Sequence, residues 1–138
     1  MVNNSDVAMR DRTRALAVIV SLYVAIVLGT IAALAVLSVT APHQVTNDAW
    51  GHAVIVAVFA VVLPLRLRAA RSGSLGALRA VGIISAVLLL VNVIEASIPG
   101  LFPLWMRVEM IGIAVIMAMV IALVVRERQG GGQRRNAT

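Results

Sequence analysis

Four long apolar runs, separated by short polar stretches, constrain the fold of this chain more than any other feature of its sequence. They cover Ala15–Val39, Ala49–Leu65, Leu75–Ile98 and Leu104–Val125. A helix needs about 20 apolar residues to cross the hydrocarbon core of a bilayer, and the second run lies near the lower limit of that range. Only 13% of the residues are charged, against about 25% in soluble domains. The sequence therefore predicts an all-α membrane protein, a four-transmembrane-helix antiparallel bundle.

The polar stretches divide the chain into three parts. We expect a leader over residues 1–14, a transmembrane domain over residues 15–125 and a tail over residues 126–138. The connection Ile98–Pro103 leaves room only for a tight hairpin, which makes the third and fourth helices antiparallel neighbours. Asn47 or Asp48 is placed to cap the second helix. The tail contains Gly130–Gly132 and is predicted to be flexible.

The leader and the first run also allow a second interpretation, a cleaved signal peptide. Basic residues precede the apolar run, and Val39–Ala41 resembles a cleavage site with small residues. However, the run is much longer than the apolar region of a signal peptide, which has roughly 7 to 15 residues. Pro42 would also follow the cut directly. We therefore expect the first run to remain as a membrane span.

The arginines are distributed unevenly around the four runs. All 12 basic residues are arginine, and in a four-span chain every one except Arg107 falls on the same side of the membrane. Basic residues accumulate on the cytoplasmic side of membrane spans. The sequence thus predicts a multi-pass protein of the plasma membrane with both termini in the cytoplasm. Trp50, Phe102 and Trp105 then gather at the opposite interface, where aromatic side chains are favoured.

Several classes of site are not expected from this composition. The chain has no cysteine, which excludes disulfides, thiolate metal sites and cysteine nucleophiles. It contains no phosphate-binding loop, H-E-x-x-H motif or dinucleotide fingerprint. The arginines flank apolar runs without interleaved aromatic residues, which indicates topology rather than nucleic-acid binding. We expect no metal, no cofactor and no nucleic-acid partner.

Five polar residues inside the predicted spans are the candidates for a functional site. A charged group in hydrocarbon costs at least a few kcal/mol and usually requires a partner. At about 1.5 Å per residue, each candidate falls within roughly 5 to 12 Å of the outer end of its helix. They come from three different helices and form a set of candidate ligand-binding residues: His52, Asn92, Glu95, Arg107 and Glu109.

Helical geometry predicts how these residues pair. Glu95 and Arg107 come level across the hairpin between the third and fourth helices, and we expect them to form an ion pair near Asn92 and His52. Arg107 and Glu109 lie about 200° apart around their helix and cannot face the same neighbour. The face of Glu109 is therefore free to meet the rest of the bundle, lipid or a second protein.

The sequence leaves three functions open. The first is an accessory or structural subunit, or a partner-binding module, of a membrane complex, with contacts through Glu109 and through the small-residue face Ala25, Gly29 and Ala33. The second is an intramembrane enzyme or lipophilic-ligand binder, in which Glu95 or Glu109 acts as acid or base with support from Arg107 and His52. The third is a small-molecule transporter formed by an oligomer. An enzymatic activity is the less favoured expectation.

Overall fold

The computed structural model describes residues 4–136, and this part of the chain is helical throughout apart from its connections. The helices are α1 (Asn4–Thr40), the short 3-10 helix η1 (Pro42–Gln44), α2 (Asn47–Arg71), α3 (Leu75–Ser97) and α4 (Leu104–Asn136). Within the described residues, four stretches are long and apolar enough to cross a membrane: Thr13–Thr40, Asn47–Arg71, Leu75–Ser97 and Leu104–Gln129. The predicted all-α fold with four candidate membrane spans is confirmed.

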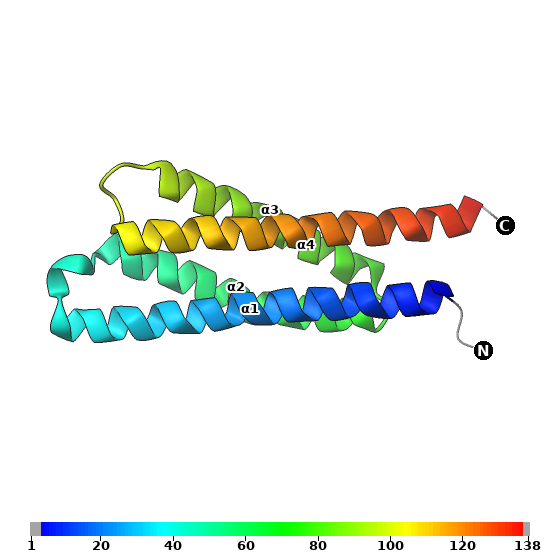
Figure 1. Ribbon diagram of the computed structural model, residues 1–138, viewed down its shortest axis with the longest axis horizontal. Coiled ribbons are helices and arrows are strands. Elements are labelled where there is room, and N and C mark those ends of the chain that lie inside the picture. Colours follow the sequence, from blue (N-terminus) through cyan, green and yellow to red (C-terminus); the bar gives the residue numbers. More distant parts are fainter. Residues whose placement is uncertain (1–3, 137–138) are drawn as a thin grey trace.

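The four long helices form a ring of neighbours. Helix α1 contacts α2 and α4, and α3 likewise contacts α2 and α4. The α1–α2 and α3–α4 connections lie at one end of the molecule (Figure 1). The turn between α2 and α3 lies at the other end, together with the beginning of α1 and the end of α4 (Figure 1). We call these the connection end and the terminal end of the ring.

Hydroxyl side chains cap the N-termini of two of the helices. Thr46 Oγ1 accepts a hydrogen bond of 3.1 Å from the Ala49 N–H at the start of α2, and Ser74 Oγ accepts one of 3.1 Å from the Ala77 N–H at the start of α3. Such caps satisfy an N–H group that has no partner within the helix. The α2 cap is therefore Thr46, not Asn47 or Asp48 as the sequence suggested.

The helices extend further than the apolar runs predicted. Helix α1 begins at Asn4, inside the expected leader, and α4 continues to Asn136, inside the expected flexible tail; residues 1–3 and 137–138 lie outside the described residues. Helix α2 passes through Pro64 and ends at Arg71. The four residues that follow the apolar run of α4, Arg126–Gln129, all have high helix propensity, so the helix continues into the tail.

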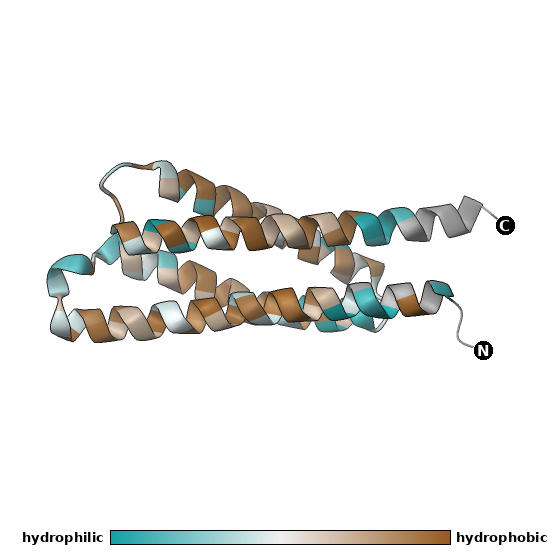
Figure 2. Ribbon diagram, viewed as in Figure 1, coloured by the Kyte–Doolittle hydropathy of each residue, from teal (hydrophilic) through white to brown (hydrophobic). Residues whose placement is uncertain are grey.

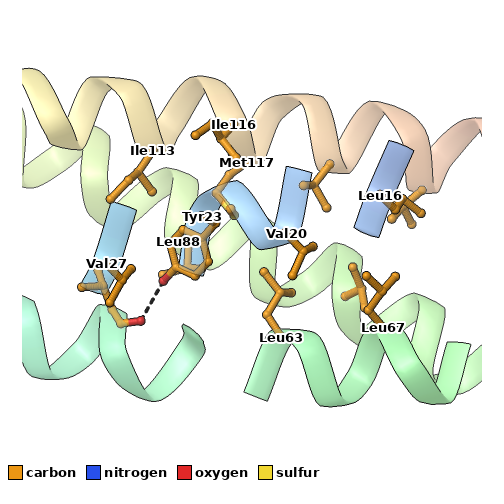
Figure 3. Packing of buried hydrophobic residues seen from close by; sticks show 14 of the residues in the cluster. Leu16, Val20, Tyr23, Val27, Leu63, Leu67, Leu88, Ile113, Ile116 and Met117 are labelled. Carbon is orange, nitrogen blue, oxygen red and sulfur yellow. Dashed lines mark hydrogen bonds between the residues drawn. The ribbon is translucent and has the colours of Figure 1, made fainter. Parts of the chain in front are cut away.

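Two clusters of buried apolar side chains fill the interior of the ring. Tyr23 and Val27 of α1 meet Leu88 of α3 and Met117 of α4 near its middle (Figure 3). A second cluster fills the connection end and includes Leu34, Ala49, Phe102, Met106 and Met110.

The outward faces of the helices are apolar as well. Val18 and Leu28 are each 62% exposed, and hydrophobic residues dominate the middle of the helices on the visible side (Figure 2). A helix that is apolar on all sides is typical of a membrane span.

Candidate functional site

The five candidate residues lie toward the connection end of the ring. His52 is in the second turn of α2, Glu95 is in the last turn of α3, and Arg107 is in the first turn of α4. Each therefore enters the interior where an apolar span meets a connection. These residues lie at a similar depth because the short connections hold the ends of neighbouring helices together.

His52 and Glu95 form a hydrogen-bonded pair between α2 and α3. Nδ1 of His52 is bonded to Oε2 of Glu95. The His52 side chain is completely buried, whereas that of Glu95 keeps 22% of its surface exposed. Phe102 covers the imidazole ring edge-to-face, with 5.9 Å between the ring centroids and an interplanar angle of 62°. The pair therefore lies against aromatic and apolar surroundings, with Glu95 on its outer side.

Glu109 and Thr30 form the corresponding pair between α4 and α1. Glu109 Oε1 is bonded to the Thr30 hydroxyl, and that hydroxyl also lies 2.9 Å from the carbonyl oxygen of Ile26. A hydroxyl group carries a single proton, so it cannot donate to both oxygens at once. Both bonds form together when Glu109 is a carboxylic acid that donates to Thr30 Oγ1. The face of Glu109 is thus turned toward α1.

Arg107 is bonded to the main chain of α3. Its Nε–H donates a hydrogen bond of 3.0 Å to the carbonyl oxygen of Ala96. Ala96 lies in the last turn of α3, where carbonyl groups lack helical partners and attract a cation. Among the described residues, Glu95 and Arg107 do not form the expected ion pair. The side chain of Glu95 is bonded to His52 instead. That expectation is corrected.

Three further polar residues lie inside the ring. Asn92 Nδ2 donates a hydrogen bond of 2.7 Å to the Leu88 carbonyl of its own helix. The Tyr23 hydroxyl donates one of 2.8 Å to the Val56 carbonyl of α2 (Figure 3). Ser85, Asn92 and Tyr23 are each 0% exposed. Thr30 and Tyr23 thus both join helices across the ring.

Some buried polar atoms in the described part of the chain have no hydrogen-bond partner. They include Nε2 of His52, Oγ of Ser85, Oδ1 of Asn92 and Oε2 of Glu109. His52 and Glu109 also lie close enough to interact electrostatically. These atoms come from α2, α3 and α4. Three helices therefore place polar atoms without hydrogen-bond partners inside the ring. Where the structure describes the chain, no three His, Asp or Glu side chains are placed to hold a metal ion together.

Comparison of the chain with protein-family models, with curated proteins and with solved structures gives no match. The functional interpretation therefore rests on the geometry of the polar residues.

Proposed function

We propose that this chain is an accessory or structural subunit, or a partner-binding module, of a complex in the plasma membrane. In this proposal its helices form an antiparallel bundle with both termini in the cytoplasm. The basic residues support this orientation, because nearly all of them belong to the terminal end of the ring.

One observation carries the proposal: a polar side chain joins every neighbouring pair of helices in the ring. Tyr23 joins α1 to α2, and the pair of His52 and Glu95 joins α2 to α3. The remaining two links are Arg107 to Ala96, between α3 and α4, and Thr30 to Glu109, between α1 and α4. Hydrogen bonds between membrane helices stabilise their association and fix their rotation. The intramembrane polar residues thus hold the bundle together, and the outer surface is left for contact with a partner.

The proposed contact surface is the small-residue face of α1. Ala25 and Gly29 are both exposed, and a Cβ atom placed on Gly29 would meet no atom within 4 Å. Small residues let the backbone of a neighbouring membrane helix approach closely. Glu109, the other contact considered from the sequence, is bonded to Thr30. The α1 face is therefore the better candidate for an intermolecular contact.

Cysteine cross-linking in native membranes tests this contact. Because the chain has no cysteine, Ala25→Cys and Gly29→Cys each introduce a single thiol on the proposed face. Val58→Cys, on the exposed apolar side of α2, is the matched control. We expect a reagent with one maleimide and one photoreactive group to give a product of defined mass from the two α1 variants and none from the control, because it joins the new thiol to a partner that need not contain cysteine. A product of twice the chain mass identifies a second copy as the partner, and a different mass identifies another protein.

Absence of a defined product from both α1 variants, together with a monodisperse monomer in mild detergent, would reject the proposed contact.

A second function, binding of a small polar ligand within the ring, is favoured by the unpartnered atoms of His52, Asn92 and Glu109. A buried polar atom without a partner costs about 1 to 3 kcal/mol, and a ligand or ordered water would satisfy it. Non-denaturing mass spectrometry of the purified chain tests this alternative. It predicts a bound small molecule that is lost in the Asn92→Leu/Glu109→Leu double variant, which removes two of the unpartnered atoms. No bound molecule on the wild-type chain, or the same molecule bound to both proteins, would exclude it.

A further inference from the structure

A groove runs between α1 and α2 on the terminal side of the polar pairs. Its volume is about 370 Å³, and its apolar walls include Ala17, Val20 and Val24 from α1 and Leu67 from α2. From Ala17 to Val24 it follows α1 for about 10 Å, at 1.5 Å per residue. This is about two-thirds of one leaflet, since the hydrocarbon core is about 30 Å thick. The groove thus has the polarity and direction to receive part of an acyl chain.

Two arginines stand at the terminal end of this groove. Arg68 and Arg71 both line it, both are exposed, and both belong to the last turn of α2. Residues three apart on a helix share one side, so the two side chains leave α2 toward the same groove. Among the side chains that the structure describes, none that lines the groove is acidic. Within the described residues, neither arginine has an ion-pair partner.

The shape of α2 at this point contributes to the groove. Pro64 lies inside the helix and lines the groove wall. Proline has no N–H group and cannot donate to the carbonyl four residues earlier, so the regular hydrogen bonding of α2 is interrupted beside the groove. On α1, Ser21 lies opposite, and its hydroxyl donates to the Ala17 carbonyl of its own helix. The groove surface is therefore apolar along its length and positive at one end.

We propose that this groove binds an anionic phospholipid, with an acyl chain against Ala17, Val24 and Leu67 and the headgroup phosphate on Arg68 and Arg71. Guanidinium groups bind phosphate oxygens through paired hydrogen bonds. A positive site that continues into an apolar groove matches the chemistry of a lipid, whose charge and chain are covalently joined. A zwitterionic lipid has the same chains but carries a compensating positive charge, so it binds more weakly.

Lipid binding to the purified full-length chain tests the proposal. The probes are a phosphatidylglycerol and a phosphatidylcholine with identical acyl chains, titrated in detergent and followed by non-denaturing mass spectrometry. We expect the wild-type chain to prefer phosphatidylglycerol. A basic residue near anionic lipid contributes about fivefold in affinity, so Arg68→Gln/Arg71→Gln should bind phosphatidylglycerol about 25-fold more weakly.

A matched variant controls for total charge. Arg66 and Arg79 are also exposed arginines of the terminal end but do not line the groove. Arg66→Gln/Arg79→Gln removes the same charge and should leave the preference unchanged. Ser21→Trp fills the groove from the α1 side and retains both arginines, and it should weaken binding of both lipids. Circular dichroism and size-exclusion chromatography show whether each variant keeps its fold.

Equal loss of phosphatidylglycerol binding in the two arginine double variants would overturn the proposal, because it would indicate diffuse attraction to a basic surface. Unchanged binding in Ser21→Trp would overturn it as well. The experiment uses the isolated chain, so its outcome does not depend on the proposed partner contact or on the orientation in the membrane.

Discussion

The Tyr23 hydroxyl on α1 donates a hydrogen bond of 2.8 Å to the main-chain carbonyl of Val56 on α2. Both residues are fully buried, with Tyr23 and Val56 each 0% exposed. The phenol ring therefore packs in the apolar core while its one polar atom reaches the neighbouring helix (Figure 3). A carbonyl oxygen has two lone pairs, so Val56 can accept this bond in addition to one within its helix.

Tyr23→Phe is expected to lower the free energy of unfolding by about 1 kcal/mol, because it removes one buried hydrogen bond and keeps the ring. Reversible unfolding of the purified chain in mixed detergent micelles measures the change. Ser38→Ala is the control, since the Ser38 hydroxyl donates to the Leu34 carbonyl of its own helix and, among the described residues, to no other helix. Equal loss of stability in both variants would show that the Tyr23 bond contributes nothing specific between helices.

The pair of His52 and Glu95 should show strong energetic coupling. Removing one member of a buried pair leaves the other polar group unsatisfied, whereas replacing both with apolar residues is often nearly neutral. We therefore expect His52→Leu and Glu95→Leu each to destabilise the chain by more than the double variant does. The coupling free energy between His52 and Glu95 in a double-mutant cycle should be about 1 to 3 kcal/mol.

Arg107 provides the control for the double-mutant cycle of His52 and Glu95. Its Nε–H is bonded to the Ala96 carbonyl and not to Glu95. The coupling free energy between Arg107→Gln and Glu95→Gln should therefore be smaller than that between His52 and Glu95, which are bonded directly. Coupling of Glu95 to Arg107 that exceeds its coupling to His52 would contradict the arrangement of the site.

The sequence predicted the depth of these residues but not their partners. Counting residues from the Ile98–Pro103 hairpin places Glu95 and Arg107 level along the helix axes. The rotation of α3 relative to α2 depends on core packing, which no short stretch of sequence contains. His52 contacts Glu95 because α2 packs on α3. The spacing of the hairpin predicts only which residues of α3 and α4 lie level, so it gives no information about a contact with α2.

Thr30 was missed as a site residue for a related reason. Ionisable side chains and the amide of Asn92 are conspicuous in an apolar run, whereas a single hydroxyl is not. Its position on the buried face of α1 is set by the long-range packing of α1 on α4. By contrast, the four spans followed from composition and length alone, because the membrane imposes both on any crossing helix.

Glu109→Gln is expected to change stability by less than about 0.5 kcal/mol, because a glutamine amide can donate to Thr30 Oγ1 as a protonated carboxyl does. Thr30→Val removes the partner, keeps the shape, and should cost about 1 kcal/mol. Unfolding in mixed micelles measures both. A large loss of stability in Glu109→Gln, near that of Thr30→Val or above it, would show that the ionised carboxylate is required.

Gly82 marks the tightest approach between α3 and α4 among the described glycines. A Cβ atom at this position would lie 3.2 Å from Cγ1 of Val124, a side chain that is only 3% exposed. The gain in helix propensity is therefore opposed by overpacking against Val124, and Gly82→Ala should be less stable than a glycine-to-alanine variant at an open helix position by about 1 kcal/mol or more.

Gly29→Ala is the control for helix propensity. An added Cβ atom there meets nothing within 4 Å, so the variant should be neutral or stabilising by up to about 1 kcal/mol. Val124→Ala in the Gly82→Ala background should recover part of the loss by making room for the methyl group. If Gly82→Ala is as stable as Gly29→Ala, the two helices are not in close contact at this point.

The proposed orientation predicts which connections can be labelled from outside intact cells. Gln44 lies in η1, between α1 and α2, and Ser72 lies in the turn between α2 and α3; both are exposed. They sit at opposite ends of the ring, so in a membrane they face opposite sides. In the cysteine-free chain, Gln44→Cys should react with a membrane-impermeant maleimide in intact cells, whereas Ser72→Cys should react only after permeabilisation. The reverse pattern would place the arginine-rich end outside the cell, against the usual distribution of basic residues. Because the groove arginines Arg68 and Arg71 share the Ser72 end of the ring, the same labelling also identifies the leaflet from which they would take an anionic lipid.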